Sequence, residues 1–79
     1  MPSSETYQIV NLYLRDAKSE KTAMVVEENE VLKKLVKQGQ VIASKNGFYL
    51  SEEGIVVAEG ALELYPFLKQ HKPEKEKKQ

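Results

Sequence analysis

Apolar residues recur with helical spacing near the middle of the chain. Leu32, Leu35 and Val36 stand at positions i, i+3 and i+4, which is the spacing of one face of an α-helix. Gly39 follows, and glycine is common just after the last turn of a helix because it takes positive φ at no cost. The pattern therefore predicts a helix over about residues 28–38, with its lysines on the side that faces water.

The next residues predict a β-hairpin and then another helix. Two short β-prone runs, 40–44 and 48–50, flank the pair Asn46-Gly47. This pair is favoured in two-residue type I′ turns, because both positions need φ > 0. Ser51 is a suitable N-cap for the helix that follows.

Two helices are predicted before this stretch. Tyr7, Val10 and Leu14 have helical spacing, which favours a helix over about residues 5–18, although the β-branched and aromatic content also fits a strand. Ser19, followed by an acid, is typical of an N-cap. It predicts a short second helix over residues 19–26, and the valines at the end of that segment suit a strand as the alternative.

The order of residues 30–54 resembles the second half of a winged-helix DNA-binding domain. In that family a recognition helix ends at Gly, a β-hairpin wing follows, and the return strand closes with a pattern like Tyr-x-Leu-(Ser/Thr)-x-x-Gly before the next helix. Here the pattern reads Phe48-Tyr49-Leu50-Ser51-Glu52-Glu53-Gly54. The resemblance implies an α+β fold, a small winged-helix domain in which a three-helix core carries a two-stranded β-hairpin wing and a C-terminal helix.

The last third of the chain predicts a helix with a wide apolar band. Its apolar positions fall on two neighbouring faces, Ile55, Ala58, Leu62 and Tyr65 on one and Val57, Ala61, Leu64 and Leu68 on the other. Pro66 should end the helix near Tyr65, and a strand over residues 55–58 is the alternative. Gly60 would let another backbone approach closely. The band is wider than one small domain needs, so we expect a homodimer through the C-terminal helix.

Length and composition limit the number of domains and the kinds of site that the chain can form. A chain of 79 residues makes one domain, and we assign residues 1–70 to it and residues 71–79, which contain no apolar side chain, to a disordered charged tail. The absence of Cys and the single His71 exclude disulfides and a structural zinc site. No apolar run approaches the length of a membrane span, and no leader pattern is present, so we expect a soluble cytoplasmic protein without membrane contact.

The sequence gives no support for an enzyme. It contains no nucleophile with a base at meaningful spacing, no Gly-rich phosphate loop and no cluster of metal ligands. We therefore expect no catalytic residues, no cofactor, no metal and no small-molecule ligand.

Charge is balanced overall but segregated along the chain. Twelve basic and twelve acidic residues give a net charge of zero, which is not typical of a non-specific nucleic-acid binder. Between Val31 and Ser51, however, there are four lysines and no acid. Together with the resemblance, this segregation implies a sequence-specific regulator of transcription that binds double-stranded DNA, with the helix at 28–38 in the major groove and a short wing at 45–47.

The candidate DNA contacts are Asn29, Lys33, Lys34, Lys37, Lys45 and Asn46. Lysines suit phosphates, and an asparagine amide suits adenine. Each residue also has a structural explanation, because lysines are routine on a solvated helix face and asparagine is a common N-cap. The alternative function is a winged-helix module for protein–protein contact without DNA binding, which the acids Glu27, Glu28 and Glu30 and the zero net charge favour.

Overall fold

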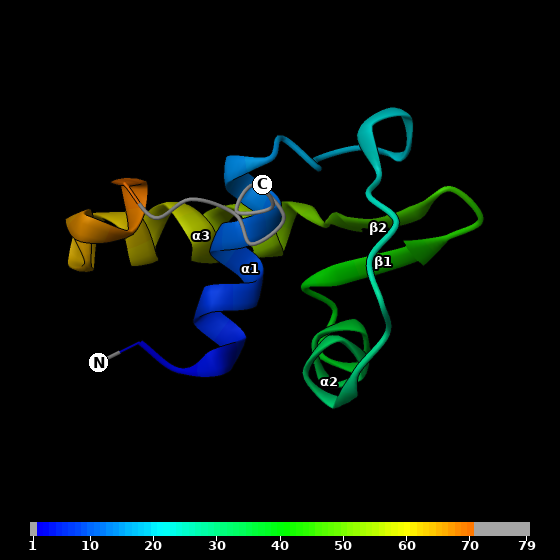
Figure 1. The fold of residues 1–79 in the computed structure, drawn as a ribbon, viewed down its shortest axis with the longest axis horizontal. Helices are drawn as coiled ribbons and strands as arrows, with labels where there is room; N and C mark the ends of the chain where they lie inside the picture. The colour runs from blue at the N-terminus through cyan, green and yellow to red at the C-terminus, as the bar shows by residue number, and fades with distance from the viewer. Residues whose placement is uncertain (1, 71–79) are drawn as a thin grey trace, which may run out of the picture.

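The described part of the chain, residues 2–70, forms a small α+β domain of three α-helices and one β-hairpin (Figure 1). The computed structural model describes residues 2–70, so the predicted tail at 71–79 lies outside the described residues. In chain order the elements are α1 (Ser4–Leu14), the 3-10 helix η1 (Glu20–Thr22), α2 (Glu30–Lys37), β1 (Val41–Ser44), β2 (Gly47–Leu50), α3 (Glu52–Leu64) and the 3-10 helix η2 (Pro66–Gln70). None of the helices in this part of the chain is long and apolar enough to cross a membrane.

Helix α1 ends four residues earlier than the apolar pattern predicts. Ser3 caps its start, accepting the Thr6 N–H at 3.2 Å. Its end is a Schellman motif, in which Asp16 takes a φ of 64° and the Ala17 N–H donates to the Leu12 carbonyl at 2.9 Å. The left-handed residue turns the chain back, and Ala17 becomes part of the core with no exposed surface.

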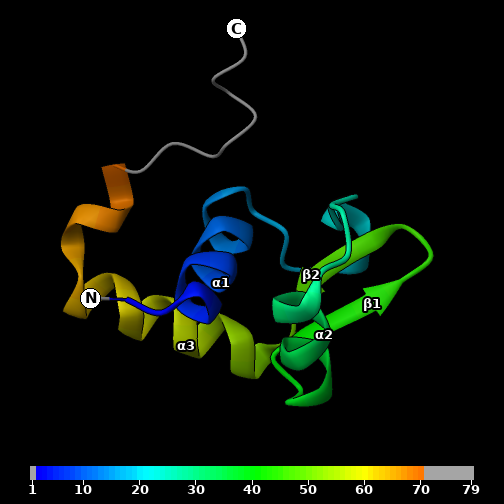
Figure 2. The same cartoon turned by 60° about the horizontal axis from the view of Figure 1, so that its bottom comes forward.

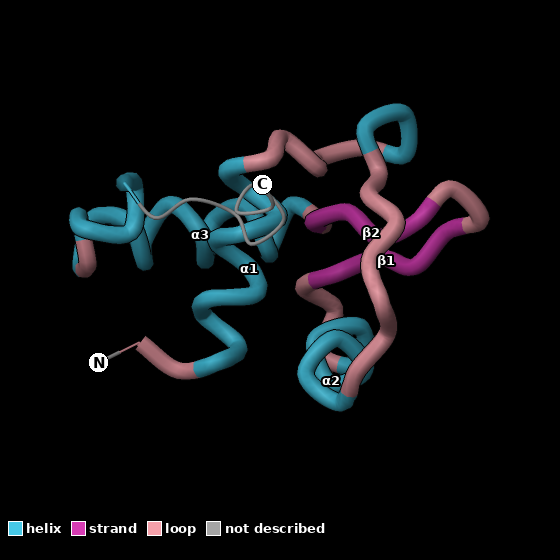
Figure 3. The backbone as a smooth tube through the Cα atoms, viewed as in Figure 1, coloured by secondary structure: helices cyan, strands magenta, loops and turns pink. Residues whose placement is uncertain are grey.

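The predicted second helix, residues 19–26, is wrong beyond its first turn. Only η1 forms, and the Thr22 hydroxyl closes it by accepting the N–H groups of Lys18 and Ser19 at 3.1 and 3.2 Å. Met24 then forms an antiparallel bridge with Phe48, with N–H···O distances of 2.8 and 2.7 Å in the two directions. Strand pairing at Met24 therefore takes the backbone groups that a helix would have used, and the loop runs on past the hairpin to α2 (Figure 3).

The hairpin has the predicted strands but not the predicted turn. The register pairs Val41 with Leu50 and Ser44 with Gly47, so the turn residues are Lys45 and Asn46. The type I′ turn over Asn46-Gly47 is wrong, because Asn46 does not have positive φ. Gly47 has a φ of 126° within β2, and a Cβ there would lie 2.2 Å from the Met24 carbonyl oxygen. Glycine is thus favoured here twice, by its positive φ directly after the turn and by the crossing segment, which leaves no room for a side chain.

The core lies where α1, α2, α3 and the base of the hairpin meet (Figure 2). Its main cluster consists of Ile9, Leu12, Ala17, Leu32, Leu35, Val41, Leu50 and Ala58, and a smaller cluster of Val10, Leu62 and Leu68 lies under η2. Leu32 and Leu35 have no exposed surface, which confirms the predicted phase of α2. Pro66 begins η2 directly after α3 ends, as expected.

Candidate nucleic-acid interface

The exposed side of α2 carries one stripe of charged side chains. Glu30, Lys33, Lys34 and Lys37 are all exposed, and their spacing of three and four residues puts them on the same helix face. Leu32 and Leu35 anchor the opposite face in the core. The structure therefore brings three of the predicted candidates together on one surface.

Asn29 fixes the start of this helix. Its Oδ1 accepts the Leu32 N–H at 2.8 Å, which is the N-cap interaction. The residue therefore lies at the end of the lysine stripe, and its side-chain carbonyl is used within the protein. The other end of α2 carries Lys34 and Lys37 in the last turn, where positive charge complements the helix dipole.

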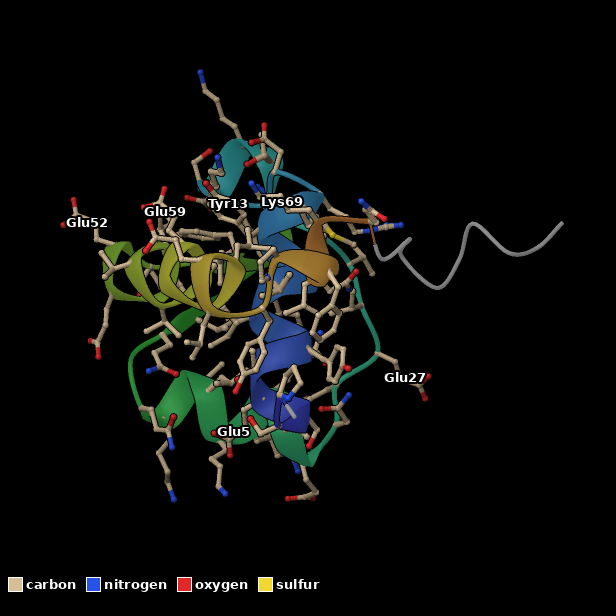
Figure 4. All side chains as sticks on the ribbon, turned by 90° about the vertical axis from the view of Figure 1, so that its left-hand side faces the viewer. Glu5, Tyr13, Glu27, Glu52, Glu59 and Lys69 are labelled. Atoms are coloured by element: carbon tan, nitrogen blue, oxygen red, sulfur yellow. The ribbon has the colours of Figure 1, made fainter. Side chains whose placement is uncertain are left out.

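A shallow groove of about 720 Å³ lies between α2 and the start of α1. Its walls carry Ser4, Glu5, Glu30, Val31, Lys33, Lys34 and Lys37. Lys34 Nζ is 3.1 Å from a carboxylate oxygen of Glu5, and Lys33 Nζ is 3.9 Å from one of Glu30. Figure 4 shows Glu5 beside α2. Reasoning from the sequence missed Glu5, because only the packing of α1 on α2 brings it next to Lys34.

These ion pairs hold the lysines weakly. Exposed pairs contribute about 0–1 kcal/mol, because water screens them and two long side chains lose freedom. Three lysines against two glutamates leave the groove with one net positive charge. The lysine ammonium groups can therefore exchange these carboxylates for other anions at little cost.

The hairpin tip is a separate surface. Lys45 and Asn46 are exposed there, and the Ser44 hydroxyl orders the turn by accepting the Asn46 N–H at 3.2 Å and donating to the Gly47 carbonyl at 3.1 Å. The turn lies at the far end of β1 from α2 (Figure 1). The structure thus does not bring Lys45 and Asn46 into the lysine stripe.

The Tyr-x-Leu-Ser-x-x-Gly pattern forms a junction that sets α2 relative to α3. The Ser51 hydroxyl donates to the Gly39 carbonyl at 2.6 Å and accepts the Gly54 N–H at 3.1 Å. The Ser51 N–H donates to the Gln40 carbonyl at 3.2 Å. A Cβ on Gly54 would lie 2.1 Å from that same carbonyl oxygen. The pattern is explained by backbone packing, and it holds the candidate recognition helix in place.

A second hollow, of about 480 Å³, lies on the other side of the domain between α1, α3 and η2. There Tyr13 donates its hydroxyl to Glu59 at 3.0 Å, and Lys18 Nζ is 4.5 Å from the centre of the Tyr13 ring. Figure 4 shows Tyr13 and Glu59 with Lys69 at the same edge. The hydrogen bond to Glu59 raises the pKa of Tyr13, with burial adding to the effect, so this phenol is a donor rather than a base.

Among residues 2–70 no group of three His, Cys, Asp or Glu side chains is placed to hold a metal ion. Comparison of the chain with protein-family models, with curated proteins and with solved structures gives no significant match. Function is therefore inferred from the geometry of the described surfaces.

Proposed function

We propose that this domain binds double-stranded DNA sequence-specifically, as a winged-helix regulator of transcription, with α2 as the recognition helix. The observation that carries the proposal is the stripe of Lys33, Lys34 and Lys37, exposed together on one face of α2. α2 is an eight-residue helix, and an α-helix with its side chains is about 10–12 Å across, which fits the major groove of B-DNA at about 12 Å wide. Lysines on such a helix contact phosphates, and exposed side chains near its start read base edges.

The order of elements supports a winged-helix variant. α2, β1, β2 and α3 follow one another as in that family, and the junction at Ser51 and Gly54 fixes their arrangement. Met24 adds a single antiparallel bridge beside β2. The domain departs from the family at residues 19–26, where η1 and an extended segment replace the second helix. The loop from Met24 to Asn29 would then determine how α2 enters the major groove of the DNA.

The hairpin tip would act as a short wing. Lys45 and Asn46 are the exposed turn residues of the hairpin, and the turn lies at the end away from α2 (Figure 1). On a duplex that holds α2 in the major groove, this tip would lie over the neighbouring backbone. It would add one phosphate contact through Lys45.

Salt dependence tests the proposal. Three phosphate contacts from α2 and one from Lys45 predict a slope of about −3.6 in log K against log salt, so affinity should fall by about 150-fold from about 50 to about 200 mM salt. Fluorescence anisotropy with a pool of random duplexes measures this slope, and selection of bound duplexes from the same pool reports sequence preference. Replacing Lys33, Lys34 and Lys37 together by Ala should remove most of the slope.

The control is Lys69→Ala, since Lys69 lies in η2 on the side of the domain away from α2 (Figure 4). Equal affinity and slope for the wild type and the triple variant would refute α2 as the contact. Binding without enrichment of any sequence would refute specificity and leave only a general affinity for polyanions.

A protein–protein module is the second candidate. It is favoured by the carboxylates of Glu5 and Glu30, which lie within 4 Å of two of the three stripe lysines. An interface of that kind would place neutral, ion-paired side chains against a partner. Its affinity would change little with salt, in contrast to the counterion-driven binding of DNA.

A further inference from the structure

The outer face of α3 carries an exposed apolar stripe. Val56 and Leu64 are 67% and 71% exposed, and Phe67 in η2, just beyond the end of α3, is 55% exposed. Gly60 lies midway between Val56 and Leu64, and a Cβ built on it would meet nothing within 4 Å. The spacing of four residues keeps these positions on one face. The domain thus presents a shallow apolar strip with a gap at its centre.

All four charged side chains of α3 are acidic, and all are exposed: Glu52, Glu53, Glu59 and Glu63. At about 100° per residue, Glu52, Glu59 and Glu63 fall within about 40° of one another. Figure 4 shows Glu52 and Glu59 along the same edge of α3. This acidic edge borders the apolar stripe at Val56, so the face is amphipathic and strongly anionic.

We propose that this outer face of α3 docks a basic amphipathic helix of another protein. Such a helix would lay its apolar side, with its own anchors at the i, i+4 and i+7 spacing of helix recognition, on Val56 and Leu64. Its lysines or arginines would reach the carboxylates of the acidic edge, and charge complementarity would set its orientation. Gly60 would let its backbone approach α3 closely.

A second copy of the chain is the competing occupant, as the homodimer predicted from the sequence. A two-fold interface sets the same patch against itself. It would therefore bring the four carboxylates of one α3 against the four of the other. α3 itself has no basic residue, and Lys69 of η2, which lines the hollow beside Glu59 and Glu63, offsets them only in part. Repulsion between the carboxylates of two α3 helices therefore favours a basic partner over a second copy of the chain. The inference does not depend on DNA binding, because α2 and α3 present different faces of the domain.

Three labelled peptides of about 18 residues test the proposal against the full-length chain. The first has leucine and lysine in an amphipathic helical pattern, the second has glutamate in place of lysine, and the third has the composition of the first in a scrambled order. Anisotropy titrations at physiological salt should show the first peptide binding at least about tenfold more tightly than the other two. Sedimentation should show the chain alone as a monomer.

Two variants locate the site. Leu64→Asp, and the joint replacement of the four α3 glutamates by Gln, should each weaken binding of the first peptide by about tenfold or more. Val25→Asp is the matched control, since Val25 is 86% exposed but lies in the loop before α2, and it should leave binding unchanged. Circular dichroism confirms that each variant folds.

Three results would overturn the proposal. Equal binding of the first and scrambled peptides would mean that charge alone attracts them. Equal affinity of the first peptide for the wild type and for Leu64→Asp would show that the α3 stripe is not the binding site. A wild-type dimer that Leu64→Asp converts to monomer would assign the face to a second copy.

Discussion

Two glycines of α3 allow the packing at its start to be tested within one helix. Gly54 is buried, and a Cβ on it would lie 2.1 Å from the Gln40 carbonyl oxygen and 3.1 Å from Leu50 Cδ2. Gly60 is exposed, and its Cβ would meet nothing. The variants Gly54→Ala and Gly60→Ala therefore add the same methyl group to the same helix in opposite surroundings.

Three contributions determine the expected change in the free energy of unfolding. Replacing Gly by Ala inside a helix stabilises it by about 1 kcal/mol at either position. At Gly54 the new methyl overpacks the junction, which costs about 1–3 kcal/mol. It also pushes Gln40 away and strains the two hydrogen bonds that Ser51 donates to Gln40 and Gly39, each worth about 1 kcal/mol.

These contributions predict stability changes of opposite sign for the two variants. Gly60→Ala should stabilise the domain by about 1 kcal/mol, and Gly54→Ala should destabilise it by about 2–4 kcal/mol. The gain in helix propensity is the same in both variants and cancels in the difference between their stabilities. The remaining difference of about 3–5 kcal/mol measures the packing and the hydrogen bonds of the junction. Urea unfolding followed by circular dichroism measures both changes, and the Tm should move by about 4–8 °C for each kcal/mol.

Either variant can refute this reasoning. A Gly54→Ala protein as stable as the wild type would show that α3 does not approach Gln40 closely. A destabilised Gly60→Ala protein would show that the outer face of α3 is not open, and it would also weaken the docking proposal. A changed m-value would indicate that the unfolding transition had altered and that the comparison no longer holds.

The remaining predictions concern the core, the turn, the lysines and Tyr13. Leu35→Ala should destabilise the fold by about 2–5 kcal/mol in urea titrations, because Leu35 has no exposed surface. Gly47→Ala should destabilise through contact with the Met24 carbonyl, whereas Asn46→Ala at the exposed tip should change stability by at most about 0.5 kcal/mol. Lys33→Ala should weaken DNA binding with almost no change in Tm. Tyr13 has a raised pKa, so its contribution to stability is complete below pH 10 and is lost as the pH rises through the pKa of the folded state. The Tyr13→Phe variant should therefore lose less stability than the wild type as the pH rises above 10.

Patterns confined to one element were enough to predict much of the fold. The spacing of Leu32 and Leu35 set the buried face of α2, and Ser51 capped the next helix as its position indicated. Such signals act within a few residues, because capping and helical periodicity are local properties. The candidate lysines followed from the same periodicity, since the residues off the apolar face of α2 had to face water.

The helix predicted over residues 19–26 and the omission of Glu5 from the candidate site both come from contacts between segments far apart in the chain. The predicted helix over 19–26 lost to a bridge between Met24 and Phe48, and the pairing residue lies 24 positions away. Glu5 entered the candidate interface through the packing of α1 on α2. Neither contact leaves a mark in the local sequence, because the partner that decides the outcome is supplied by the tertiary fold.

Gly47 shows how a correct local signal can have a second physical cause. The pair Asn46-Gly47 predicted a hairpin, and the hairpin is present, but the turn lies one residue earlier. The glycine has the positive φ that the pair predicted for it, and it is needed also because the Met24 backbone crosses it, at a place where any side chain would collide. The same holds for Gly54, whose place in the winged-helix pattern is explained by the carbonyl of Gln40. Both glycines mark close backbone crossings on either side of β2, and these crossings fix where α2 stands relative to the hairpin and α3. If α2 is the DNA-binding helix, its orientation is therefore set by two positions that would not themselves touch the duplex.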